Sequence, residues 1–119
     1  TLNAPAPIGP YSQAVKAGSL LFISGQIAFK PGTTELITGN IQEETEMVMQ
    51  NLKAILETAG LAFANVIKTT IFLKEMASFA AVNEVYGKFF ESDFPARETV
   101  AVKELPRDVN VEISMIASE

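Results

Sequence analysis

The pattern of apolar and polar positions predicts a two-stranded hairpin near the start of the chain. Residues 11–17 can form a short strand, and a more apolar strand runs from Leu20 to Ile27. Between them, Gly18-Ser19 is a two-residue hairpin signal. The proline-rich residues 4–10 are expected to form an ordered, extended arm, because each proline fixes its own backbone angle and restricts the residue before it.

A second pattern, with helical spacing, follows a loop predicted at residues 30–39. Asn40 has the spacing of an N-cap, with the acidic residue Glu43 three positions later. The predicted helix carries one apolar stripe and stops near Gly60. The stripe consists of Val48, Leu52, Ile55, Leu56 and Ala59.

The second half of the chain predicts three more strands and one more helix. Residues 66–73 are β-branched and aromatic, which favours a central strand. Ser78 is a candidate N-cap for a helix whose apolar stripe consists of Phe79, Val82, Tyr86, Phe89 and Phe90. After a break at Phe94-Pro95-Ala96, residues 97–103 and 109–117 are predicted to form a hairpin that turns near Pro106-Arg107-Asp108.

The resulting order, ββαβαββ, predicts an α+β fold with two helices packed on one face of a mixed sheet. We find no internal repeat and expect a single domain over residues 1–119. Residues 20–23 and 71–73 are apolar at successive positions, so they present apolar groups on both faces of the sheet. The face without helices therefore needs a partner, and further copies of this chain are the simplest one.

Composition limits the chemistry that this fold can perform. The chain has no cysteine and no histidine, which removes thiol nucleophiles, histidine bases and nearly all zinc or copper sites. An all-carboxylate Mg²⁺ or Ca²⁺ site stays formally open, but no spaced aspartate cluster is present, and we expect neither metal nor cofactor. The net charge of −5 disfavours nucleic acid as a partner. With no membrane-spanning run and no secretory signal, we expect a soluble, cytoplasmic protein.

The two arginines occupy different contexts. Arg107 lies in a predicted turn, where a solvated side chain is expected. Arg97 follows a proline turn at the start of a strand, and its planar fork could bind a ligand carboxylate or form an ion pair with a residue such as Glu112. Glu112 lies in an otherwise apolar strand, where a carboxylate is costly unless paired or used. In the predicted hairpin the two residues are about 13 Å apart, which favours a site shared between subunits.

Several neutral polar groups are weaker candidates. Asn83 lies beside the apolar stripe of the second helix and could face a ligand, although a helix-surface asparagine is the simpler interpretation. Tyr11, Ser24 and Gly25 offer a phenol, a hydroxyl and an accessible backbone N–H. Gly25 could equally mark a bulge or a bend in a strand.

Short motifs are distributed in order along nearly the whole chain. They are Ala4-Pro5, Ile8-Gly9-Pro10-Tyr11-Ser12-Gln13, Ser24-Gly25-Gln26, Ala59-Gly60-Leu61, Val66-Ile67-Lys68-Thr69, Phe79, Val82-Asn83, Tyr86, Phe94-Pro95-Ala96-Arg97, Leu105-Pro106 and Val111-Glu112-Ile113. Together they resemble the RidA/YjgF family of 2-iminobutanoate/2-iminopropanoate deaminases. The resemblance implies a homotrimer with a chorismate-mutase-like fold, in which the helices lie outside, the sheets form a central barrel and the ligand sites lie in clefts between subunits.

The resemblance also implies roles for particular residues. Arg97 would bind the substrate carboxylate, and Glu112 would position the hydrolytic water. The remaining pocket residues would be Tyr11, Ser24, Gly25 and Asn83, together with a backbone group of Thr99. The implied reaction converts a reactive 2-imino acid into a 2-oxo acid and ammonia, which would protect pyridoxal-phosphate enzymes.

Two positions depart from the family pattern. Many relatives have cysteine where this chain has Thr99, and a small residue where it has Glu98, although strand alternation should turn Glu98 away from Arg97.

Two other functions are alternatives to imine hydrolysis. A non-catalytic trimer that binds metabolites is the main alternative. A ribonuclease or translation inhibitor, a role ascribed to some relatives, is disfavoured by the acidic composition.

Overall fold

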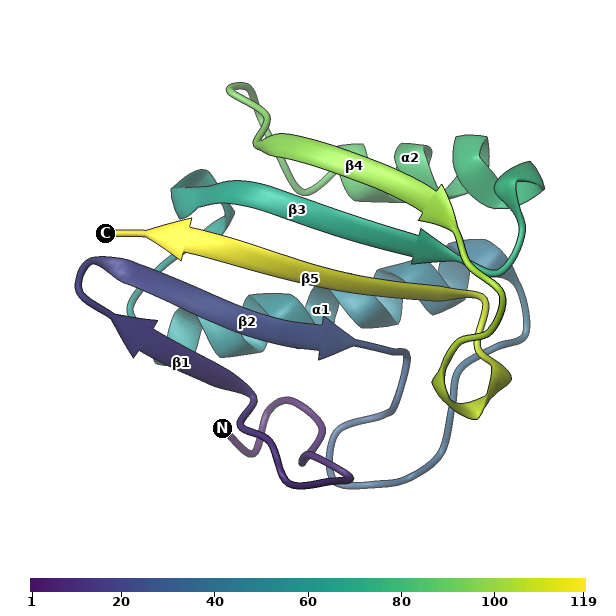
Figure 1. Ribbon diagram of the computed structural model, residues 1–119, viewed down its shortest axis with the longest axis horizontal. Helices are drawn as coiled ribbons and strands as arrows, with labels where there is room; N and C mark the ends of the chain where they lie inside the picture. Colours follow the sequence, from purple (N-terminus) through teal and green to yellow (C-terminus); the bar gives the residue numbers. More distant parts are fainter.

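The computed structural model describes all residues from 1 to 119 and confirms the predicted order of elements (Figure 1). The strands are β1 (Ala14–Ala17), β2 (Leu20–Gln26), β3 (Val66–Leu73), β4 (Ala96–Ala101) and β5 (Val111–Ser118). The helices are α1 (Ile41–Thr58) and α2 (Phe79–Gly87), with short 3₁₀ turns at Phe63–Asn65, Met76–Ser78 and Pro106–Asp108. None of the helices is long and apolar enough to cross a membrane.

The five strands form one mixed sheet in the order β1-β2-β5-β3-β4. Only β3 and β4 are parallel, and the other neighbours are antiparallel. The predicted hairpin of the last two strands is therefore wrong, because β3 lies between β4 and β5 (Figure 1). Thr69 of β3 pairs with Arg97 on one side and with Met115 on the other. The segment from β4 to β5 thus crosses over the end of β3 instead of turning back on its own strand.

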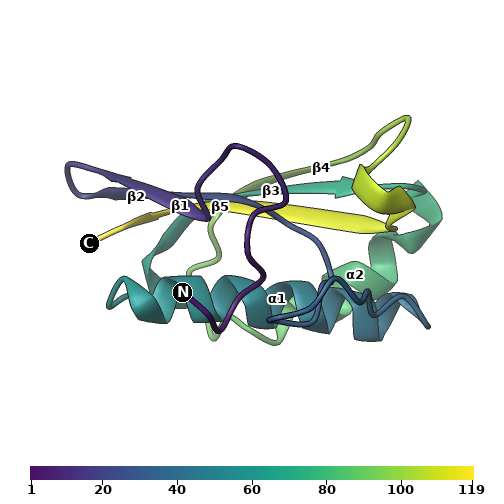
Figure 2. The ribbon, with the colours of Figure 1, turned by 90° about the horizontal axis from the view of Figure 1, so that it is seen from below.

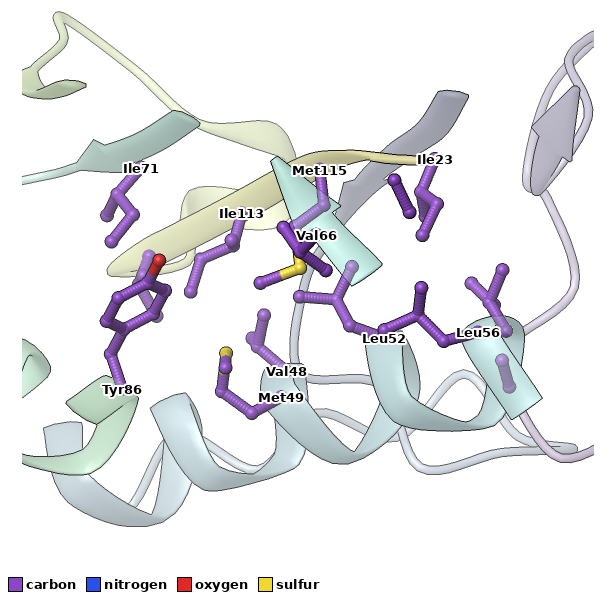
Figure 3. Close-up of a cluster of buried hydrophobic side chains, with 14 of the residues drawn as sticks. Ile23, Val48, Met49, Leu52, Leu56, Val66, Ile71, Tyr86, Ile113 and Met115 are labelled. Atoms are coloured by element: carbon purple, nitrogen blue, oxygen red, sulfur yellow. The ribbon is translucent and has the colours of Figure 1, made fainter. Parts of the chain in front are cut away.

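Both helices cover the same face of the sheet, and the other face has no helical layer (Figure 2). The core lies between α1 and the strands, where side chains such as Leu52, Ile113 and Met115 are almost fully buried (Figure 3). On β5, Val111, Ile113, Met115 and Ala117 are buried, and the residues between them are only partly buried. This period-2 pattern assigns the odd-numbered residues of β5 to the helical side.

The cap of the first helix is confirmed. Asn40 has an extended backbone, and its side-chain oxygen accepts a 2.8 Å hydrogen bond from the backbone N–H of Glu43. This bond satisfies one of the free N–H groups of the first turn. At the other end, Gly60 has a φ of 75°, a left-handed conformation that glycine adopts without steric cost.

Other local predictions need correction. Ser78 closes a 3₁₀ turn in a helical conformation, and its side chain makes no capping hydrogen bond. Helix α2 ends at Gly87, so the predicted stripe residues Phe89 and Phe90 lie beyond it. Strand β1 begins at Ala14 instead of Tyr11, because the preceding segment belongs to the arm. The side chain of Gln13 holds that arm by donating a 2.8 Å hydrogen bond to the carbonyl of Pro5.

The face opposite the helices carries exposed apolar side chains, as the sequence predicted. Val15 and Phe22 are paired across β1 and β2 and are 56% and 43% exposed. On the same face, Lys68 and Glu98 form a 2.7 Å ion pair between β3 and β4. Glu98 thus points away from the helical side, which confirms the expected orientation.

Candidate functional site

A small cavity lies where the N-terminal arm passes the end of the sheet. It has a volume of about 160 Å³ and is lined by Pro5, Ala6, Pro7, Ile8, Tyr11, Gln13, Gly25, Gln26, Ile27, Phe29, Pro106 and Glu112. Three of the predicted site residues, Tyr11, Gly25 and Glu112, therefore meet here. The lining is mostly uncharged, and Glu112 is its only ionisable group apart from the Tyr11 phenol.

Glu112 projects from β5 on the face without helices, because it alternates with the buried Val111 and Ile113. Burial in this cavity raises the pKa of the Glu112 carboxyl group above its usual range, because partial removal from water disfavours the charged form. A carboxylate of this kind, beside a space large enough for a small molecule, is a candidate general base.

Gly25 leaves the space that the Glu112 carboxylate occupies. The register between β2 and β5 shifts between Ile23 and Gln26, which places two residues of β2 opposite one residue of β5. A Cβ atom on Gly25 would lie 2.7 Å from Oε2 of Glu112, closer than such atoms approach one another. A β-bulge was one interpretation of Gly25 from the sequence, and the bulge is present. The absence of a side chain at Gly25 leaves room for the Glu112 carboxylate.

Ser24 contributes to the same region indirectly. Its hydroxyl donates a 2.6 Å hydrogen bond to the carbonyl of Ser12, and its backbone N–H donates to the carbonyl of Gln13 at 2.9 Å. Ser24 thereby fastens the arm to β2 and keeps Tyr11 at the edge of the cavity.

Arg97 lies on the other face of the sheet. It pairs with Thr69, whose hydroxyl accepts a 3.0 Å hydrogen bond from the phenol of Tyr86 on the helical side. The guanidinium carbon of Arg97 is 5.1 Å from the ring centre of Tyr86 and 5.7 Å from that of Phe79. Arg97 forms no ion pair within the chain, so the alternative of a structural pair with Glu112 is wrong for the single chain. Its fork is free to bind an anion.

Polar and aromatic side chains of β3, β4 and α2 surround Arg97. Desolvation raises the pKa of the buried Tyr86 phenol, an effect that the Thr69 hydrogen bond and the Arg97 charge partly offset. Thr99 lies two residues beyond Arg97 on the same side of β4, and its hydroxyl is buried without a hydrogen-bond partner. Asn83 lies between Phe79 and Tyr86 on the same side of α2, because residues three or four apart share a helix face.

The predicted site residues therefore fall into two groups. One group, at the cavity, holds Glu112, Tyr11, Gly25 and Ser24, and the other holds Arg97, Asn83 and Thr99. Glu112 pairs with Phe72 and Arg97 with Thr69, so strand spacings place their Cα atoms about 14 Å apart on opposite faces. No three acidic side chains gather as metal ligands.

Two features of the site were not predicted from the sequence. Phe79 and Tyr86 were interpreted as part of an apolar helix stripe and of the family motifs, without a role in the site, yet their rings lie against the Arg97 guanidinium group. Arg107 is an exposed turn residue, as expected, but its guanidinium carbon also lies 5.4 Å from the ring centre of Phe29. Aromatic side chains near an arginine are the only sequence signal for such contacts, and they do not reveal which ring meets which cation.

Comparison with known proteins identifies the family of the chain. The family model described as Endoribonuclease L-PSP matches residues 1–119. The chain belongs to the RidA/YjgF family. A RutC family protein of Pyrococcus horikoshii is 54% identical over 98% of this chain and 93% of its own length. A Dermatophagoides farinae member of the family named 2-iminobutanoate/2-iminopropanoate deaminase is 46% identical over 95% of this chain and 88% of its own.

Solved structures of RidA/YjgF proteins have the same fold. RidA from an Antarctic Psychrobacter species superimposes with a TM-score of 0.96 at 41% identity, covering 100% of this chain and 96% of the other. Escherichia coli TdcF, solved with bound serine, gives a TM-score of 0.95 at 42% identity over 100% and 95% of the two chains. The prediction of fold and family from scattered motifs is thus confirmed.

Proposed function

We propose that this RidA/YjgF protein hydrolyses small, reactive 2-imino acids such as 2-iminobutanoate and 2-iminopropanoate to 2-oxo acids and ammonia. The observation that carries the proposal is the Glu112 carboxylate, whose pKa is raised by burial in a small cavity without a counter-cation in its lining. The free guanidinium of Arg97 supplies the second requirement, an anchor for the substrate carboxylate. The name of the Dermatophagoides relative supports the same activity.

The chemistry needs only positioning and a base. An imine carbon is already electrophilic, so a water molecule oriented and deprotonated by Glu112 can add its oxygen to that carbon. The proton held by Glu112 then passes to the nitrogen of the resulting amino alcohol. Glu112 next takes the proton of the new hydroxyl group as the C–N bond breaks and ammonia leaves. The electron pair of the oxygen closes the new C=O bond of the 2-oxo acid. Tyr11 and the backbone of Gly25 lie beside Glu112 and supply neutral donors for the reacting groups.

We also propose that the complete site forms between subunits of a homotrimer. Within one chain, Arg97 and Glu112 lie on opposite faces of the sheet and cannot hold one small molecule together. The exposed apolar residues on the face without helices, Val15, Phe22 and Val100 among them, supply an interface. A cyclic assembly of three sheets would bury this face and bring Arg97 of one chain to the cavity of the next.

The direct test follows the decay of an imine. A dehydratase acting on threonine releases 2-iminobutanoate, and trapping with semicarbazide measures how much imine remains at each time. We expect the protein to accelerate imine loss, and an unchanged rate with a trimeric preparation would refute the proposed activity. Sedimentation of the same preparation measures its oligomeric state.

Binding without catalysis is the second candidate, favoured by the serine bound to the related TdcF structure. Calorimetry with 2-oxobutanoate distinguishes the two functions. A protein that binds 2-oxobutanoate yet leaves imine decay unchanged would be a ligand-sensing trimer. The description of the family model also names an endoribonuclease, but the net charge of −5 gives RNA no favourable field to bind.

The close approach of Gly25 to Glu112 predicts the effect of a small change. In Gly25→Ala the new Cβ would overlap Oε2 of Glu112, so the carboxylate must move away from the water position. We expect kcat for 2-iminobutanoate to fall about 100-fold, the typical effect of a misplaced catalytic group. Gly87→Ala is the matched control, because a Cβ there meets no atom within 4 Å and activity should persist. Equal activity of the two variants would contradict the assigned role of Gly25.

A further inference from the structure

Both arginines of the chain lack a carboxylate partner, and each is held against an aromatic ring instead. The four ion pairs all use lysines, at positions 16, 30, 68 and 74. Arg97 lies over Tyr86 and Phe79, and Arg107 lies over Phe29. Stacking fixes the plane of a guanidinium group and leaves its N–H donors available. The proposed activity uses Arg97 and leaves Arg107 without a role.

Arg107 lies at the rim of the cavity that contains Glu112. The ring of Phe29, which it covers, is part of the cavity lining, and so is Pro106, the residue directly before it. The lining itself contains no cation. An anionic group of a ligand that entered this cavity near Glu112 would find Arg107 as the nearest arginine of the same chain.

The turn holds Arg107 in an unusual conformation. Its φ is 56° and that of Asp108 is 54°, a left-handed region that costs free energy for residues other than glycine. Neighbouring contacts maintain the turn. The buried Glu44 accepts hydrogen bonds of 2.8 Å from both the backbone N–H and the side-chain amide of Asn110, and Asp108 pairs with Lys74 at 3.1 Å. The adjacent carboxylate thus pairs with Lys74 and forms no ion pair with Arg107.

We propose that Arg107 is a specificity residue that binds a second carboxylate, so that the site accepts 2-imino and 2-oxo dicarboxylic acids. This inference rests on the proposed function, in which Arg97 of the neighbouring chain binds the first carboxylate. The two guanidinium groups would then hold the two ends of the ligand, and the imine carbon would lie between them beside Glu112. A monocarboxylic ligand would use Arg97 alone.

Calorimetry tests the proposal without requiring catalysis. The parent protein is titrated with 2-oxoglutarate and with 2-oxobutanoate, and we expect tighter binding of the dicarboxylate. In Arg107→Ala the affinity for 2-oxoglutarate should fall about 10- to 100-fold, as expected for lost hydrogen bonds between charged groups, and the affinity for 2-oxobutanoate should not change. Arg107→Lys should recover only part of the preference, because an ammonium group lacks the planar fork.

Lys103→Ala is the matched control, since it removes one cation from the same loop without touching the Phe29 ring, and it should leave both affinities unchanged. An equal effect of Arg107→Ala on both ligands, or no effect on either, would overturn the specificity role. The hydrolysis rates of 2-iminosuccinate and 2-iminopropanoate, generated by amino-acid oxidases, provide the second readout. Activity on 2-iminopropanoate without selectivity at Arg107 refutes this inference alone, whereas loss of imine hydrolysis altogether refutes the proposed function.

Discussion

Replacing Glu112 by glutamine should lower kcat for imine hydrolysis by about 10²- to 10⁴-fold, the usual contribution of a positioned general base. The amide keeps the shape of the side chain but cannot accept the proton of the attacking water. KM should change little, because the carboxylate anchor is elsewhere. Single-turnover measurement of imine loss separates the chemical step from binding and directly gives the ratio of the parental rate constant to that of the variant. A variant with parental kcat would exclude Glu112 as the base.

The pH dependence of the parent enzyme provides an independent check. A base must be ionised to act, and burial raises the pKa of Glu112. Activity should therefore decline on the acidic side with an apparent pKa above that of an ordinary glutamate, and the Glu112→Gln profile should lack this limb. A limb in the ordinary carboxyl range would contradict the assignment.

The same pKa shift predicts how stability responds. The folded state holds the Glu112 proton more tightly than the unfolded state, so this group favours folding below its unfolded pKa and loses that contribution as pH rises through the folded pKa. At neutral pH Glu112→Gln should melt no lower than the parent. Scanning calorimetry at acidic and neutral pH tests this and shows that lost activity is not lost folding.

Arg97 is expected to give the second large effect. Arg97→Ala removes two charge-assisted hydrogen bonds to the substrate, which together correspond to about 3 kcal/mol, or roughly 100-fold in kcat/KM. Arg97→Lys keeps the charge and should recover only part of the loss, because an ammonium group cannot form the parallel pair of bonds. Comparison of kcat/KM for 2-iminobutanoate across the three proteins measures both effects. Full activity of Arg97→Ala would remove it from the site.

Mixing the two inactive variants tests whether the site is shared. If each cleft combines Arg97 of one chain with Glu112 of the next, hybrids of Arg97→Ala and Glu112→Gln chains contain some intact clefts. Random cyclic assembly from equal amounts should restore about a quarter of parental activity. Refolding the variants together, with each refolded alone as the control, gives the comparison. No recovery in confirmed hybrids would place the site within one chain.

Local signals predicted the elements well and their pairing less well. Residues 66–73 were expected as a strand and are β3, because their β-branched composition suits a central position. Asn40 was expected as a cap and acts as one. The predicted pairing of β4 with β5 was wrong. The turn-like segment at Pro106 resembles a hairpin turn locally, but β3 lies beside β5, so the segment connects two strands that are not neighbours. The choice between β3 and β4 as the neighbour of β5 depends on residues far from this turn in the sequence, so the residues of the turn do not reveal it.

The site shows the same limit. Motifs with family resemblance made Arg97, Glu112 and Gly25 candidate site residues. The sequence alone could not show that Glu112 and Arg97 lie on opposite faces, since that follows from the pairing of each strand with β3. The contact of Arg107 with Phe29 was not predicted, for a related reason. Its contact with Phe29 joins residues 78 positions apart in the chain, and no period or spacing connects them.

The separation of Arg97 and Glu112 across the sheet has a consequence for how much activity the protein shows at different abundances. If the site is shared between subunits as proposed, a single chain carries the Arg97 part of one site and the Glu112 part of another, and it would be inactive alone however well it is folded. Under the proposed assembly, specific activity should fall on dilution below the dissociation constant of the trimer and rise with protein concentration. The amount of this chain would then set the rate of imine removal more steeply than in direct proportion.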